Sequence, residues 1–230
     1  MKRFYTDVAV TEALGITLDG RAVRTPARVP LILLSASMAE AVAEEWRAQG
    51  EEIDPRTMPM TGLANATIDR VLPDPSGFAA PLVAYGETEL LCYRAGDPPE
   101  LVERQDAIWG PALAWARARY DVGFTLVTGI MHQPQPAATV QRLADAVLAR
   151  SAWELAALNP MITISGSLIL SMAVLEGEQT PAAAFAAAHL DELFQAELWG
   201  EDDWALEART VREADFLAGC RFLQLVGAGA

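Results

Sequence analysis

The cysteines and histidines are the residues of this chain best suited to nucleophilic, acid–base or metal chemistry. The cysteines are Cys92 and Cys220, and the histidines are His132 and His189. Zinc sites and cysteine–histidine dyads need ligands or partners at defined spacings, which this set does not provide. Cys92 lies between leucines and a tyrosine, a setting typical of a small core residue. We therefore predict no catalytic residue, no metal site and no cofactor.

The glycines do not form a phosphate-binding loop. The segment from Gly15 to Gly20 predicts a hairpin, whereas a nucleotide-binding glycine loop joins a strand to a helix. The Gly166–Leu168 segment lacks the flanking glycines of a nucleophile elbow. The sequence therefore indicates a protein that works without binding ATP itself.

The Leu190–Glu207 segment combines acidic and large apolar residues and contains no lysine or arginine. Its acids are Asp191, Glu192, Glu197, Glu201, Asp202, Asp203 and Glu207, and its apolar residues include Leu190, Leu193, Phe194, Leu198, Trp199 and Trp204. In a helix, Glu197 lies three and four residues after Phe194 and Leu193, so it falls on or beside the apolar stripe.

Two interpretations of this segment stay open. In the first, the acids at positions 201–203 complement the positive end of the last helix, which does not account for Glu197. In the second, the acids and aromatic residues recognise a protein partner that carries arginine or lysine beside apolar groups. The six tryptophans of the chain are likewise either core residues or anchors for a partner.

A different class of function is a small-molecule enzyme with a pocket in the helical part of the chain. In this alternative, Glu197 and His189 act as the acid and the base. His189 follows Phe185 by four residues and precedes Leu193 by four, which is more typical of a histidine at a helix interface.

Charge and hydropathy disfavour several other classes. The chain has 31 acids against 17 bases and a net charge of −14, which repels nucleic acids and anionic membranes. Its most apolar stretch, Met161–Leu175, would span about 22 Å as a helix, less than the roughly 30 Å of a bilayer core. The first residues resemble neither a signal nor a transit segment, so we expect a cytoplasmic protein without membrane insertion.

The elements that must position these residues form an α+β pattern. Strand-like runs fill the first 35 residues, with a hairpin at Asp19-Gly20 and a buried strand at Leu31–Leu34. Helical periodicity follows, over residues 37–49, 61–71, 78–93, 140–148, 161–175, 181–199 and 203–226, with a lone strand at 124–128. We predict a small antiparallel β domain with the first helix over residues 1–60, and a larger, mostly helical domain over 61–230.

Seven segments, in this order, resemble one known family. They are Arg3-Phe4-Tyr5; Leu18-Asp19-Gly20-Arg21 with Val23-Arg24-Thr25-Pro26; Ala43-Glu44-Glu45-Trp46; Met58-Pro59-Met60-Thr61 with Ala64-Asn65; Glu87-Thr88-Glu89-Leu90-Leu91-Cys92-Tyr93-Arg94; Ser165-Gly166-Ser167-Leu168; and Trp199-Gly200-Glu201. The chain is similar, over nearly its whole length, to the assembly chaperones of the F-type ATP synthase that handle the free α subunit of the catalytic head.

The resemblance implies a protein that is not an enzyme and that shields the unassembled α subunit from aggregation until the β subunit replaces it. It also implies a bacterial form that acts in the cytoplasm, and we expect a monomer when the protein is free. The expected partner-binding residues are Phe194, Glu197, Trp199, Glu201, Asp203 and Trp204 near the last two helices, and Trp46 in the first helix.

Overall fold

The computed structural model describes residues 1–228, and contacts between residues divide the chain into two compact units. Unit 1 comprises residues 1–75, 151–157 and the chain from Ala218 onward, and unit 2 comprises residues 76–150 and 158–217. Two helices, α6 (Ala152–Ser165) and α10 (Asp203–Gly227), contribute residues to both units. The division into residues 1–60 and 61–230 stays a prediction.

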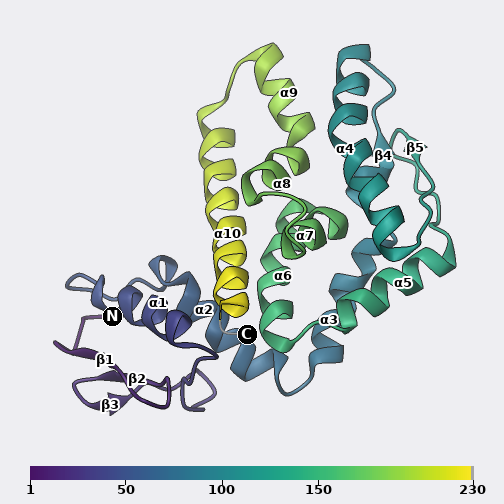
Figure 1. Cartoon of the computed structure of the whole chain (residues 1–230). Helices are drawn as coiled ribbons and strands as arrows, with labels where there is room; N and C mark the ends of the chain where they lie inside the picture. The colour runs from purple at the N-terminus through teal and green to yellow at the C-terminus, as the bar shows by residue number, and fades with distance from the viewer. Residues whose placement is uncertain (229–230) are drawn as a thin grey trace. The chain divides into compact units, whose positions relative to one another are not determined.

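The predicted α+β class is confirmed, because a small antiparallel sheet is followed by a mostly helical chain (Figure 1). The strands are β1 (Val8–Val10), β2 (Ile16–Leu18), β3 (Arg21–Ala22), β4 (Tyr93–Arg94) and β5 (Val127–Thr128). The helices before α6 are α1 (Ala36–Arg47), α2 (Pro59–Ala66), α3 (Pro75–Val83), α4 (Pro99–Tyr120) and α5 (Ala137–Leu148). After α6 come α7 (Leu168–Leu175), α8 (Pro181–Ala188), α9 (Leu190–Trp199) and α10.

The sheet of unit 1 is built around the predicted hairpin. Its strand order is β1-β2-β3, antiparallel throughout, with Leu18 opposite Arg21. Asp19 and Gly20 have φ angles of 47° and 76°, the positive values that a two-residue type I′ turn requires. The Asp19 carboxylate accepts hydrogen bonds from the backbone N–H groups of Thr6 and Asp7, at 3.0 and 2.8 Å. These bonds fix the turn against the chain that leads into β1.

The prediction of a buried strand at Leu31–Leu34 is wrong. Leu31 and Leu33 are buried, but Ile32 and Leu34 are exposed, and the segment makes only an isolated bridge between Ile32 and Gly15. In this extended segment, which lies outside the three-stranded sheet, the period of two sends every second side chain to solvent, even when all of them are apolar.

Helix α1 positions a carboxylate that starts the next helix. The Oγ of Ser35 accepts a hydrogen bond from the Met38 N–H and caps α1, which begins one residue before the predicted start at residue 37. Near the other end of α1, Glu45 accepts hydrogen bonds from the Met60 and Thr61 N–H groups at 2.7 and 2.8 Å. No side chain at the start of α2 supplies such a cap, so Glu45 takes that role.

We expect Glu45→Gln to lower the free energy of unfolding by about 1–2 kcal/mol, because an amide has only one acceptor oxygen for these donors. Urea unfolding followed by circular dichroism measures the change. Glu44→Gln is the matched control, since Glu44 is exposed and lies 3.9 Å from Arg221 in a weak ion pair. Equal losses in the two variants would contradict the capping role.

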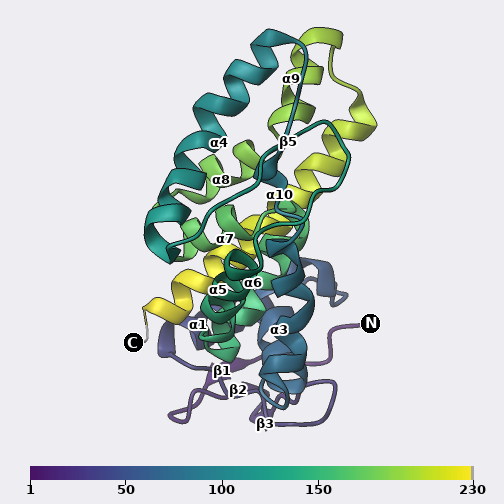
Figure 2. The same ribbon diagram turned by 90° about the vertical axis from the view of Figure 1, so that its right-hand side faces the viewer.

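Unit 2 packs its helices around α4 and α7. Helix α4 lies against α5, α7 and α9, and α7 lies against α8 (Figures 1 and 2). Trp109 of α4 is fully buried, and its indole N–H donates to the Ala187 carbonyl oxygen at 2.8 Å. Strands β4 and β5 pair in parallel, with Tyr93 opposite Val127. The predicted strand at 124–128 is therefore shortened to its last two residues.

The predicted helix over residues 78–93 is wrong in its second half. Helix α3 ends at Val83, and two 3-10 turns, Ala84–Gly86 and Leu90–Cys92, lead into β4. Glu89 departs from helical geometry with a ψ angle of 120°, and its side chain accepts a hydrogen bond from the Leu91 N–H. The chain turns here because the Glu89 carboxylate is held in the core of unit 2.

Two helices that the sequence predicts as continuous are each divided in two. The apolar stretch 161–175 breaks at Gly166, which has a φ of 66°, and Ser167 then caps α7 through a hydrogen bond from the Leu170 N–H. The stretch 181–199 breaks at His189, between α8 and α9. A glycine followed by a serine is the usual sequence of a helix end followed by a helix start.

We expect Gly166→Ala to destabilise unit 2 by about 1–2 kcal/mol, because a Cβ disfavours the left-handed backbone even where space is open. Gly123→Ala is the control in the same unit, since Gly123 also has open space and has no positive φ. Chemical unfolding of both variants tests this, and a cost for Gly123→Ala as large as that for Gly166→Ala would refute it.

The apolar stretches of the chain are short. Within residues 1–228, no helix has both the length and the apolar character to cross a bilayer.

Candidate functional site

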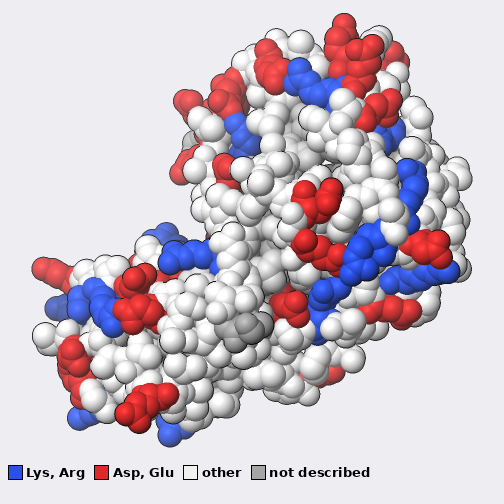
Figure 3. Space-filling model, viewed as in Figure 1, with Lys and Arg blue, Asp and Glu red and all other residues white. Residues whose placement is uncertain are grey.

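Helices α9 and α10 meet in a sharp turn that exposes two tryptophans. The turn passes through Gly200, whose φ of 88° lets the chain reverse between the helices. Trp199 is 78% exposed and Trp204 is 80% exposed, and Leu198 beside them is also exposed. We call Leu198, Trp199 and Trp204, with the surrounding acids Glu197, Glu201 and Asp203, the tip surface. Figure 3 shows acidic side chains gathered over this end of α9 and α10, with basic ones between them.

The other tryptophans are not available in the same way. Trp109 is fully buried, and Trp46, Trp115 and Trp153 are partly buried. The structure therefore separates the two exposed anchor candidates in the acidic segment from the four tryptophans that are partly or fully buried.

Glu197 is held by an arginine from another helix. One Arg104 nitrogen lies 2.8 Å from each carboxylate oxygen of Glu197. The Arg104 guanidinium also lies 5.1 Å above the ring of Phe194, which is buried. Phe194 thus supports the Arg104–Glu197 pair from below and does not itself reach the tip surface.

The other acids of the tip surface differ in their partners. Glu201 pairs with Arg209, which also contacts Glu192 at 3.3 Å. Asp203 lies in the first turn of α10, where a carboxylate interacts favourably with the helix dipole. Within the described residues, Asp202, Asp203 and Glu207 make no side-chain hydrogen bond or ion pair, so they keep their full charge toward solvent.

Five of the seven predicted partner-binding residues come together at the tip surface: Glu197, Trp199, Glu201, Asp203 and Trp204. Phe194 lies beneath it, and Trp46 lies in unit 1. The sequence patterns did not indicate Arg104 and Arg209 as part of the site. Arg104 lies 93 residues from Glu197 and gave no local signal, whereas Arg209 follows the acidic segment directly in α10.

The acid and base of the enzyme alternative are not arranged as a pair. His189 is buried, its ring stacks on Phe185 with centroids 4.0 Å apart, and its Nδ1 lies 2.9 Å from the Phe185 carbonyl oxygen. Burial lowers the pKa of His189, which favours its neutral form. The described residues show no hydrogen bond or ion pair between His189 and Glu197, and no cluster of three or more potential metal ligands.

An exposed tryptophan pair surrounded by carboxylates is a surface suited to binding another protein. Comparisons with known proteins define the class to which this fold belongs, which is that of the chaperones. The model of the family described as "ATP12 chaperone protein" matches residues 2–117, half of the chain. The chain belongs to the ATP12 chaperone family, and the resemblance to ATP synthase assembly chaperones is confirmed.

Solved structures and a curated relative support this assignment. The crystal structure of Atp12 from Paracoccus denitrificans matches with a TM-score of 0.90 and 37% identity over 98% of both chains. A putative chaperone from Agrobacterium tumefaciens matches with a TM-score of 0.90 and 42% identity, over 97% of this chain and 85% of the other. The mitochondrial protein atp12 of Schizosaccharomyces pombe is 24% identical over 216 residues, 86% of this chain and 74% of the relative.

Proposed function

We propose that this protein is an ATP-independent chaperone that binds the unassembled α subunit of the F-type ATP synthase catalytic head. It prevents aggregation of the α subunit until the β subunit takes its place. Membership of the ATP12 chaperone family supports the general role, and the identity of the partner comes from the sequence resemblance. We place this activity in the bacterial cytoplasm, with a free chaperone that is monomeric.

The observation that carries the proposal is the exposure of Trp199 and Trp204. Large aromatic side chains in water are costly unless a partner covers them, and tryptophan is enriched among residues that dominate binding energy. The unpaired carboxylates around them favour a partner surface with arginine or lysine next to apolar groups. The net charge of −14 keeps such a surface from associating with itself.

The test offers the purified α and β subunits separately to the chain, with and without ATP. We expect a complex with the α subunit alone, suppression of α-subunit light scattering at equimolar chaperone, and no effect of ATP on either result. Release of the chaperone when the β subunit is added completes the expected pattern. Failure to bind the α subunit, or binding only to the β subunit, would overturn the proposal.

A further inference from the structure

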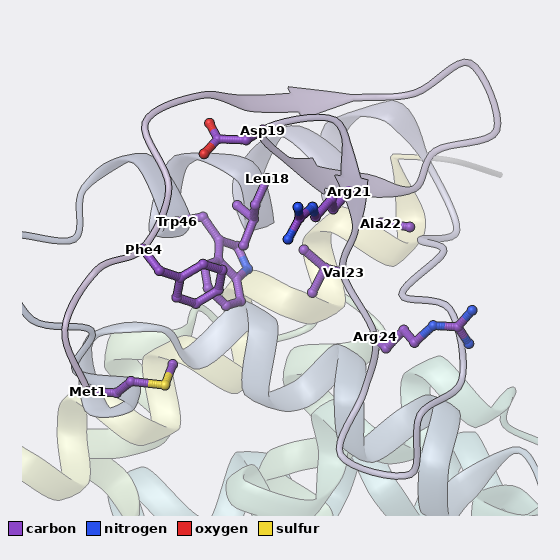
Figure 4. Close-up of a pocket in the computed structure, with 9 residues that line it drawn as sticks. All are labelled: Met1, Phe4, Leu18, Asp19, Arg21, Ala22, Val23, Arg24 and Trp46. Carbon is purple, nitrogen blue, oxygen red and sulfur yellow. The ribbon is translucent and has the colours of Figure 1, made fainter.

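Unit 1 contains a pocket of about 480 Å³ that the proposed function does not use. It lies between the first residues of the chain, the β2–β3 hairpin and helix α1 (Figure 4). Phe4, Leu18, Val23 and Trp46 give it an apolar lining. Its charged lining residues are Arg21, Arg24 and Asp19. A pocket of this size accommodates one or two side chains.

The apolar lining is open to solvent and contains an unused hydrogen-bond donor. Phe4 is 64% exposed. A large aromatic ring that no other element covers is unusual on a protein surface. Trp46 packs its indole edge-to-face with Tyr5, with ring centroids 5.7 Å apart. The indole Nε1 of Trp46 is buried and has no hydrogen-bond partner. A buried donor without a partner costs free energy, so a ligand that shifts the Trp46 indole and brings an acceptor oxygen to its Nε1 gains that free energy back.

The charged side chains that line the pocket are net positive, because Arg21 and Arg24 outnumber Asp19, although the protein is strongly acidic. Residues 1–35 carry five bases and three acids, whereas the whole chain has a net charge of −14. Figure 4 shows Arg21 directed toward the rings of Phe4 and Trp46, whereas Arg24 points away from them. Within the described residues, the Arg21 side chain makes no hydrogen bond or ion pair, although its charge interacts with that of Asp19, whereas the Arg24 side chain donates to the Arg28 carbonyl oxygen at 2.8 Å.

The pocket also adjoins a strand that can accept another strand. In the order β1-β2-β3, strand β3 is at the edge and pairs only with β2. The chain directly after β3 is already paired, since the Leu31 N–H donates to the Val23 carbonyl oxygen at 3.1 Å, so the free edge is limited to Arg21 and Ala22. Both of its residues, Arg21 and Ala22, are exposed. Edge strands present backbone N–H and C=O groups on which an extended peptide forms a further strand.

We propose that this pocket docks an extended segment of a partner polypeptide in which an apolar side chain is flanked by carboxylates. The segment adds to β3, its apolar side chain enters between Phe4 and Trp46, an acceptor oxygen pairs with the Trp46 indole, and a carboxylate pairs with Arg21. This pocket binds a negatively charged segment, whereas the tip surface binds a positively charged one. The proposal holds whether or not the α subunit binds at the tip surface.

A defined peptide tests the proposal. It has a fluorophore on its N-terminus and an amidated C-terminus, with a Val-Phe-Val core flanked by two glutamates on each side, and its matched control has lysines in place of the glutamates. We expect the glutamate peptide to bind the full chain in fluorescence anisotropy and the lysine peptide not to bind. Arg21→Glu weakens binding about fivefold or more, whereas Arg24→Glu, with the same change in net charge, has little effect.

Nuclear magnetic resonance locates the binding. The Trp46 indole signal, assigned with Trp46→Phe, shifts downfield when the peptide binds, and the Trp199 and Trp204 signals stay in place. Equal binding of the two peptides, equal losses in the two arginine variants, or a shift confined to Trp199 and Trp204 would each overturn the proposal. Tighter binding of a ten-nucleotide oligothymidine would assign the pocket to nucleic acid instead. None of these outcomes bears on the α-subunit test, which uses a different partner and surface.

Discussion

Replacing Trp199 and Trp204 together by alanine weakens binding of the free α subunit at least about a hundredfold. The two indoles are the most exposed large aromatic groups at the tip surface, and an anchor residue of this kind contributes about 2 kcal/mol or more. Two such losses correspond to two or more powers of ten in the dissociation constant. Because both side chains are already in water, the thermal unfolding temperature stays within a few degrees of the unaltered chain. Pull-down and light-scattering assays with the purified α subunit measure the effect.

The control for this variant removes exposed apolar surface elsewhere. Ile130 is 94% exposed and Met131 is 75% exposed, and they lie in the loop after β5 rather than near the tip surface. The Ile130→Ala/Met131→Ala protein should still bind the α subunit. If the two double variants lose binding equally, the tip surface has no special role and general apolar exposure accounts for the activity.

The second large effect is a dependence of stability on pH that comes from one buried carboxyl group. Glu89 is fully buried; the Ser167 hydroxyl donates to it at 2.5 Å and the Ile169 N–H at 3.1 Å. Burial raises the pKa of Glu89 from its ordinary value of 4.5 to about 7, despite these hydrogen bonds. In the folded protein this carboxyl therefore keeps its proton at pH values where the unfolded chain has lost it.

The direction of the pH dependence follows from the difference between the pKa of Glu89 in the folded protein and in the unfolded chain. The contribution of Glu89 to stability is complete below about pH 4.5 and is lost as the pH rises to about 7. Over that window the loss is at most about 1.4 kcal/mol per pH unit, or about 3 kcal/mol in total. Above pH 7 the group is ionised in both states, so its contribution no longer changes.

Urea unfolding at pH 5, 6, 7 and 8 measures this dependence. Glu89→Gln does not titrate at this position. The free energy of unfolding of the unaltered chain minus that of this variant should therefore fall from pH 5 to pH 7 and then stay constant. Glu178→Gln, at an exposed carboxylate of the same unit, should follow the unaltered chain throughout. A constant difference between the unaltered chain and Glu89→Gln over the whole range would show that the Glu89 carboxyl does not titrate in this way.

Local sequence signals predicted the parts of the fold that depend on local chemistry. The Asp19-Gly20 hairpin is correct because positive φ at two successive positions is a property of those residues themselves. The helix expected at 140–148 corresponds to α5, whose apolar residues repeat with helical spacing. The α10 helix also begins at the predicted residue, Asp203, where its acidic first turn is a local signal.

The errors in the predicted fold come from interactions between distant residues. Glu89 ends the helical region after α3 because its carboxylate bonds to residues 78 and 80 positions later in the chain. The break at Gly166 is an exception, because its glycine–serine pair is a local signal within an otherwise continuous apolar pattern. The apolar run at Leu31–Leu34 gave no sign that it lies outside the three-stranded sheet, because strand pairing depends on distant residues.

For the candidate site as well, local features were predictable from the sequence and interactions between distant residues were not. The sequence located the acidic and aromatic segment and named most of the tip surface, since the residues are close together in the chain. It did not determine which tryptophans are exposed, because exposure depends on what packs over each ring. It also did not indicate that Glu197 is paired with Arg104, a residue of α4.

The uneven exposure of the tryptophans gives the protein an intrinsic optical reporter. Indole emission moves to shorter wavelength when the ring leaves water, and only Trp199 and Trp204 among the six have most of their surface in water. A partner that covers the turn between α9 and α10 therefore changes the emission of these two rings and leaves that of the other four nearly constant. Formation and release of the complex are thus observable in real time on the unlabelled chain.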